Sequence, residues 1–274
     1  MAKEQTHDGL LWDHPRHRAA KHAILERCLE AWLSSLDDAD REVTFVDGSA
    51  GPDEYEGGEP GSPIVALNVA DEQQAILAHR AMRFIFVEED DVRAERLERT
   101  LNAREIPANI ETVVVPGAFE EAMGRLLEAL GDAEMGRTLV MVDPFGVAGV
   151  PFHVMKQLAK QPRCDLLVTC MPETLSRWTE TNEQEGGHVD RMFGGPNWRP
   201  FSLEGQVDFY RDNLQAAGFT HTRRLTLIDQ RTKSTYYLII ATHAAESAAA
   251  TAAAFAVVDG SARQAFTTEA PPTG

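Results

Sequence analysis

The fold is decided by a stretch that reads VTFVDGSAGP at residues 43–52. Its first four residues are β-branched or aromatic, which predicts a short buried strand that ends at Asp47. Small residues follow the strand: Gly48, Ser49, Ala50 and Gly51. Such residues let a ligand approach the backbone closely. Residues 48–63 then hold five glycines, three prolines and four acidic residues, which predicts a long glycine-rich loop.

The same alternation of strand and helix continues along the chain. Apolar runs that predict further strands occupy residues 84–87, 113–115, 139–142 and 165–170, with helical spacing between them. Residues 219–228 and 234–242 are joined by a short polar turn, which predicts an antiparallel hairpin. We therefore expect an α/β protein with a Rossmann-like, mostly parallel doubly wound sheet and a C-terminal antiparallel hairpin.

The organisation along the chain follows from these elements. We expect an N-terminal helical segment at residues 1–40 and a Rossmann-like cofactor-binding core at 41–171, then an inserted lid or recognition segment at 172–200, which shows no clean periodicity. The C-terminal part of the core, with the hairpin and a terminal helix, follows at 201–260, and a disordered tail follows at 261–274.

Composition and charge limit the classes of function that the chain can have. The formal net charge of −17 over 274 residues disfavours binding to duplex DNA, although basic residues crowded at 14–22 leave an RNA acceptor open. No apolar run approaches the ~20 residues of a membrane span, and the N-terminus lacks the pattern of a secretory signal. We therefore expect a cytoplasmic protein without membrane contact. The three cysteines form no CxxC pair and are interpreted as core residues: Cys28, Cys164 and Cys170.

The residues that close the strands carry the functional signal, because ligands of open parallel sheets bind beyond the carboxyl ends of the strands. Asp47 closes the first strand, Glu88 the second, and Asp143 the fourth. An acidic residue at Glu88 can accept hydrogen bonds from ribose hydroxyls, which suits a dinucleotide or S-adenosylmethionine. The first turn lacks the G-x-G-x-x-G spacing and is acidic, so a sulfonium cofactor is favoured over a pyrophosphate. The alternative is that these carboxylates only cap helices.

Several of these stretches resemble the three-Cys-motif partner (TcmP) family. The resemblance covers residues 12–243 and rests on FVDGSAGP at 45–52, YEGGEPGSP at 55–63, FIFVE at 84–88 and VDPFG at 142–146. The entry helix from Trp12 to Trp32 also contributes, as do FG at 193–194, WR at 198–199 and TYYL at 235–238. It implies a class I S-adenosylmethionine-dependent methyltransferase fold and a three-cysteine protein as partner. The chain departs from the family pattern at Ser49, Asp53 and Ala118.

From the residues and this resemblance we expect a methyltransferase that uses S-adenosylmethionine on a nitrogen or oxygen nucleophile of a small molecule, peptide or RNA. The expected cofactor-binding residues are Asp47, Gly48, Ser49, Ala50, Gly51, Ser62, Pro63, Glu88, Ala118, Phe119 and Asp143. Asp143 can orient or deprotonate the acceptor and Phe145 can stack on it, while no metal site is expected. The alternative is a noncatalytic Rossmann-fold subunit that supports a three-cysteine radical-type enzyme.

Overall fold

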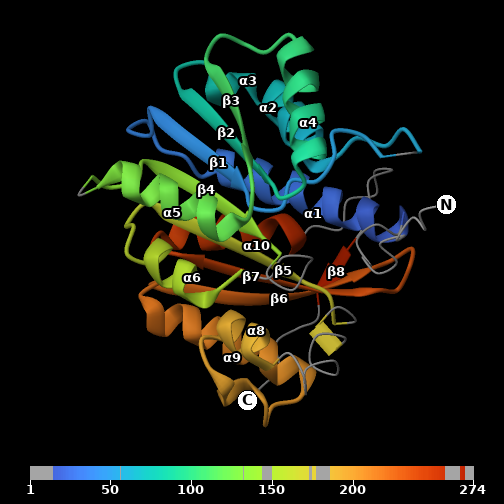
Figure 1. Ribbon diagram of the computed structural model, residues 1–274, viewed down its shortest axis with the longest axis vertical. Coiled ribbons are helices and arrows are strands. Elements are labelled where there is room, and N and C mark those ends of the chain that lie inside the picture. Colours follow the sequence, from blue (N-terminus) through green and yellow to red (C-terminus); the bar gives the residue numbers. More distant parts are fainter. Residues whose placement is uncertain are drawn as a thin grey trace, which may run out of the picture.

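The computed structural model describes residues 15–55, 57–131, 133–143, 150–172, 175–176, 186–256 and 266–268. Its helices are α1 (Pro15–Ser34), α2 (Ser62–Glu72), α3 (Gln74–Leu77), α4 (Asp91–Ala103), α5 (Phe119–Leu130), α6 (Phe152–Leu158), α8 (Gly186–Phe193), the 3₁₀ helix η2 (Pro196–Trp198), α9 (Leu203–Ala217) and α10 (Ala245–Ala256). The strands are β1 (Glu42–Asp47), β2 (Ala81–Glu88), β3 (Ile110–Pro116), β4 (Arg137–Val142), β5 (Cys164–Cys170), β6 (His221–Asp229), β7 (Thr235–Thr242) and β8 (Phe266–Thr268) (Figure 1).

All eight strands form one sheet in the order β3-β2-β1-β4-β5-β7-β6-β8. The first five are parallel, whereas β7 joins β5 antiparallel and pairs with β6 as the expected hairpin. The predicted fold class is confirmed. Strand order reverses between β1 and β4, and this reversal is where ligands of doubly wound sheets bind.

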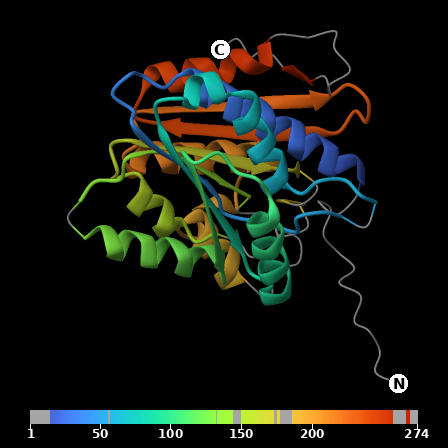
Figure 2. The same ribbon diagram turned by 90° about the horizontal axis from the view of Figure 1, so that it is seen from above.

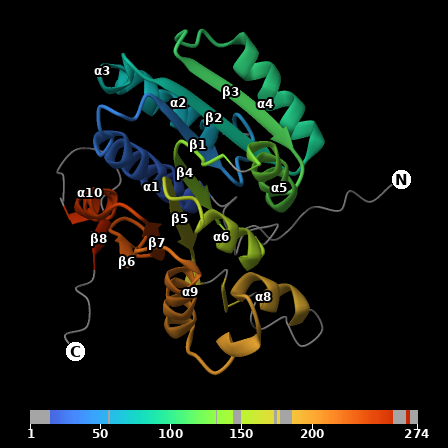
Figure 3. The ribbon, with the colours of Figure 1, turned by 90° about the vertical axis from the view of Figure 1, so that its left-hand side faces the viewer.

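Helices cover both faces of the sheet because the parallel strands are apolar on both sides. On β1, Phe45 belongs to a core with residues of α1, α2, α4 and α10, whereas its neighbour Val46 belongs to a core with residues of α5, α6 and α9. Figure 2 shows α1 and α10 on one side of the sheet and α5 and α6 on the other. Figure 3 shows the same separation from the side, with α1 next to α10.

Two elements differ from the sequence expectation. Helix α9 was not foreseen, although Ser202 caps its start and Val207, Tyr210 and Leu214 form its buried stripe. Strand β8 lies in the segment expected to be a disordered tail, because Phe266 is fully buried and pairs with Asp229 of β6. In the part of the chain that the structure describes, no helix is both long and apolar enough to cross a membrane.

Candidate functional site

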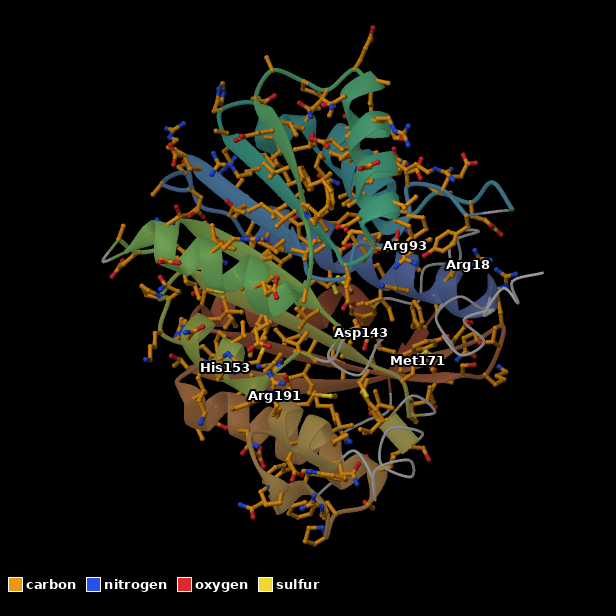
Figure 4. The ribbon with its side chains drawn as sticks, viewed as in Figure 1. Arg18, Arg93, Asp143, His153, Met171 and Arg191 are labelled. Atoms are coloured by element: carbon orange, nitrogen blue, oxygen red, sulfur yellow. The ribbon has the colours of Figure 1, made fainter. Side chains whose placement is uncertain are left out.

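The expected site residues meet at the carboxyl edge of the parallel strands. Asp47 ends β1 and Asp143 directly follows β4, and the two strands are joined there by a 2.9 Å hydrogen bond from the Gly48 amide to the Met141 carbonyl. Arg93 and Met171 follow β2 and β5 at the same edge, in the same part of the molecule as Asp143 (Figure 4). The candidate site therefore lies where the strand order reverses.

Asp47 braces the turn that follows β1. Its Oδ1 accepts a hydrogen bond from the Ser49 amide at 3.1 Å, and its Oδ2 lies 2.7 Å from the Ser62 hydroxyl. The same hydroxyl is 2.6 Å from the carbonyl oxygen of Ala50, so Ser62 at the start of α2 ties both ends of the turn together. Asp47 and Ser62 are buried and act on the backbone of this turn. Pro63 is buried behind them in the first turn of α2.

Two positions of the turn, 48 and 51, require glycine for different physical reasons. A Cβ on Gly48 would lie 2.7 Å from the Phe119 ring and 2.8 Å from Val142, so the strand ends approach more closely than a side chain allows. Gly51 has a φ of +70°, a left-handed conformation that a branched residue adopts only with strain. Ser49 is exposed between them, whereas Ala50 is buried and donates its amide to Val87 at 2.9 Å.

The part of the glycine-rich loop that follows the first turn, residues 52–61, is held between α1 and α4. The Asp53 carboxylate lies 2.8 Å from Arg96 and accepts a 2.7 Å hydrogen bond from Thr100, both on α4. On the other side, the guanidinium carbon of Arg18 on α1 lies 4.2 Å from the centre of the Tyr55 ring. The loop also closes on itself, because the Gly61 amide donates to the Asp53 carbonyl at 2.7 Å.

Glu88 is buried at the end of β2 and is already partly used by the protein. Its Oε1 accepts hydrogen bonds from the Asp90 amide at 2.9 Å and from Arg93 Nε and Nη2 at 2.9 and 2.7 Å. Within the described residues no hydrogen bond reaches its Oε2. Arg93 therefore fixes the carboxylate and leaves one oxygen as an acceptor.

The end of β3 offers little polar chemistry. Ala118 is half-buried at the N-cap of α5 and supplies no side-chain cap, while Gly117 donates its amide to the Glu88 carbonyl at 2.9 Å. Phe119 is 4% exposed because its ring packs over Gly48. The ring is therefore part of the wall behind the first turn.

Asp143 is 6% exposed and sits directly beyond β4, next to the first turn. Asp47 of β1 and Glu88 of β2 are each 3% exposed. Three neighbouring strands, β2, β1 and β4, therefore each bring a buried carboxylate to this edge. Phe145, the other expected catalytic residue, lies outside the described residues. Among the residues that the structure describes, no cluster of potential ligands could hold a metal ion.

A polar cluster on the surface links three helices on one face of the sheet. The Glu120 carboxylate on α5 lies 3.0 Å from Arg191 of α8 and 3.3 Å from His153 of α6 (Figure 4). All three side chains are more than a third exposed, so the pairs contribute little stability. The Arg191–Glu120 contact joins α8, part of the expected lid or recognition segment, to α5. Trp198 in this segment is 4% exposed and stacks on Phe193, which makes it a packing residue.

Sequence reasoning missed the basic partners of the site. Arg93 follows Glu88 by five positions, on the first turn of α4, and this spacing was the available signal. Arg96 is three residues further along the same helix. Arg18 was noted only as part of a basic stretch, because nothing local in the sequence brings it to Tyr55.

No protein-family model and no curated protein matches the chain. The resemblance to the TcmP family therefore stays an interpretation of its motifs. Among solved structures, the chain is similar to the O-methyltransferase from Bacillus cereus in complex with SAH, at 9% identity and a TM-score of 0.44, covering 81% of each chain. It is also similar to the methyltransferase domain of METTL16 (9%, 0.40, 82% of this chain and 83% of that one) and to the human methyltransferase 10 domain containing protein (11%, 0.39, 80% and 82%). At these identities the similarity is one of fold.

Proposed function

We propose that the protein is an S-adenosylmethionine-dependent methyltransferase whose cofactor binds at the carboxyl edge, between the ends of β1 and β4. The observation that supports this best is Glu88, a buried carboxylate held by Arg93 with Oε2 left as an acceptor. A ribose diol supplies the two hydroxyl donors that such an oxygen accepts, and a charge-assisted hydrogen bond of this kind is strong.

The first turn fits the same ligand. Asp47 and Ser62 hold the backbone from Gly48 to Gly51 in place, and the left-handed Gly51 lets a ligand come close. Carboxylates surround the turn, so a pyrophosphate would be repelled and a sulfonium cation attracted. We assign Asp47 and Ser62 as positioning residues and Glu88 as a direct ligand. Ser49, Ala50, Pro63, Ala118 and Phe119 form the walls.

The cofactor supplies a methyl group on a sulfonium, which is already a good electrophile. What the chain must then do is bind, orient and accept a proton. We propose that Asp143 holds a nitrogen or oxygen acceptor by its N–H or O–H, and that it takes this proton as the acceptor's new bond to the methyl carbon replaces the carbon–sulfur bond. Phe145 follows two residues later and we propose that it stacks on the acceptor.

The proposed acceptor is a small molecule, a peptide or an RNA. The alternative, a noncatalytic subunit that supports a three-cysteine protein, is favoured by Ala118, which offers no polar side chain at the end of β3, and by the Phe119 ring that fills the space over Gly48.

Transfer of a radiolabelled methyl group tests the two readings. Purified protein is incubated with labelled S-adenosylmethionine and fractions of a cell extract, and the labelled fraction then serves as acceptor. If Asp143 is the base, Asp143→Asn and Asp143→Ala both slow transfer about 10²–10⁴-fold. If it only orients the acceptor, the asparagine variant keeps much more activity than the alanine variant. Full activity of Asp143→Ala would remove this residue from the mechanism, and no labelled product from any fraction would favour the noncatalytic subunit.

A further inference from the structure

A cluster of two side chains, Arg18 and His22, faces the glycine-rich loop from the first turns of α1. Arg18 stacks on Tyr55, and the His22 ring lies 6.1 Å from the same ring, centre to centre. Arg18 is the charged member of the cluster, a cation in a chain whose formal net charge is −17. Figure 4 shows Arg18 on the same side of the molecule as Arg93.

The charge of Arg18 is poorly satisfied within the described residues. Its side chain is only 13% exposed, and its Nε is buried without a hydrogen-bond partner among the residues that the structure describes. Within the described part of the chain, the carboxylate paired with Arg18 is that of Glu59, 4.0 Å from Nη1, and the Glu59 side chain is half exposed to water. A buried guanidinium nitrogen without an acceptor is costly, so an added anion would be stabilising here.

His22 beside it adds a neutral hydrogen-bonding group. Its Nε2 is also buried without a hydrogen-bond partner in the described part of the chain. Burial, with the charges of Lys21 and Arg18, lowers the pKa of His22 to about 4. At neutral pH the imidazole is therefore uncharged and contributes a donor or an acceptor, while Arg18 carries the charge.

The position of this cluster relates it to the first turn. The loop that holds Tyr55 begins directly after Gly51, and Asp53 fixes it to the helix that follows Glu88. The described side chains of the turn itself are acidic or small. The acidic side chains of the turn would repel a ligand that carries a carboxylate unless a cation paired with that carboxylate. Arg18 is a largely buried cation that contacts the loop next to the turn.

We propose that Arg18, supported by Tyr55 and His22, binds a carboxylate, and that this carboxylate is the one at the amino-acid end of the cofactor. The inference rests on the proposed function. It adds a residue of α1 that contacts the cofactor directly, and it gives the glycine-rich loop a role as the support of that residue.

Calorimetric titration with two ligands tests the assignment. S-adenosylhomocysteine carries the carboxylate, whereas its decarboxylated analogue keeps the adenosine, the sulfur and the amino group. We expect the wild type to prefer the first ligand by about 10-fold to 100-fold, as one charge-assisted contact implies. Arg18→Ala should abolish this preference by weakening the first ligand alone, and Arg18→Lys should restore part of it. Arg223→Ala, at an exposed arginine of β6, is the matched control.

The outcomes separate the two proposals. If the wild type binds both ligands equally, or if Arg18→Ala keeps the preference with an unchanged melting temperature, the carboxylate is held elsewhere and the inference is wrong while the methyltransferase proposal stands. If neither ligand binds the wild type, both proposals fail. A loss of binding of both ligands by Arg18→Ala would indicate a structural role and would also overturn the assignment.

Discussion

His22 shows how one side chain can be tuned by its surroundings. Burial of its ring on α1 disfavours the charged form, and the positive charges of Lys21 and Arg18 disfavour it further. The pKa of an exposed histidine, near 6.5, falls to about 4 at this position. The folded protein therefore keeps the imidazole neutral over a range in which the unfolded chain is protonated.

This difference predicts a pH dependence of stability. Between pH 6.5 and about 4 the unfolded state binds a proton at His22 that the folded state does not, so the free energy of unfolding falls as the pH is lowered. The stability that the neutral His22 contributes is fully present above pH 6.5. Between pH 6.5 and about 4, the free energy of unfolding falls because of His22 by at most about 1.4 kcal/mol for each pH unit. Urea unfolding at several pH values should show a smaller loss for His22→Gln than for the wild type. Parallel curves for the two proteins would place His22 in a solvated environment.

At the scale of elements, the glycine-rich loop depends on α4. Asp53 is buried, and its carboxylate contacts Thr100 and Arg96, which lie on successive turns of one face of that helix. The side chain of Arg96 is 55% exposed, so the hydrogen bond from Thr100 is the stronger of the two attachments.

Thr100→Val should loosen this loop without unfolding the protein. The valine keeps the shape of the side chain but removes the donor to a buried carboxylate, a change that costs about 1–3 kcal/mol. We expect faster amide hydrogen exchange in residues 52–61 and an affinity for S-adenosylhomocysteine that is lowered several-fold. Arg99→Ala, an exposed position on the same helix, is the control and should change neither. Unchanged exchange in the loop would show that Asp53 is not its anchor.

At the scale of the whole molecule, one buried carboxylate joins elements that are distant in sequence. Asp165 at the start of β5 accepts hydrogen bonds from Trp32 of α1 at 2.8 Å and from Ser247 of α10 at 2.9 Å. It also pairs with Arg137 of β4 at 2.8 Å and accepts from Thr242 at the end of β7. This network fixes α1 and α10 against the sheet at the edge opposite the proposed site.

Removing Asp165 should destabilise the whole fold. Asp165→Ala leaves Arg137 buried without its counter-charge, which costs about 3–5 kcal/mol in free energy of unfolding. Asp165→Asn keeps the shape and should lose less, so it serves where the alanine variant fails to fold. Asp212→Ala breaks an exposed pair with Arg211 and should change stability by about 1 kcal/mol or less. Equal urea midpoints for the Asp165 and Asp212 variants would contradict the central role of the network.

The parts that the sequence predicts are those with local causes. Apolar runs such as residues 139–142 mark buried strands, and the order of strands and helices implies the Rossmann-like sheet. Pairings such as Trp32 with Asp165 span 133 residues, and no local pattern signals them. The same holds for Arg18 against Tyr55, and the use of Glu88 Oε1 by Arg93 depends on where α4 begins. Sequence thus predicts which acids end the strands, and the fold decides which oxygens stay accessible to a ligand.

The most direct test of the account is a calorimetric titration of the purified, dialysed wild type with S-adenosylhomocysteine, repeated with Glu88→Ala. We expect binding to the wild type and a loss of about 2 kcal/mol in binding free energy in the variant, since a charged acceptor for the ribose hydroxyls is removed. Glu89→Ala, at the exposed neighbouring position, should bind as the wild type does. Absence of binding to the wild type, or equal affinity in the wild type and Glu88→Ala, would contradict a cofactor site at the carboxyl edge of the sheet.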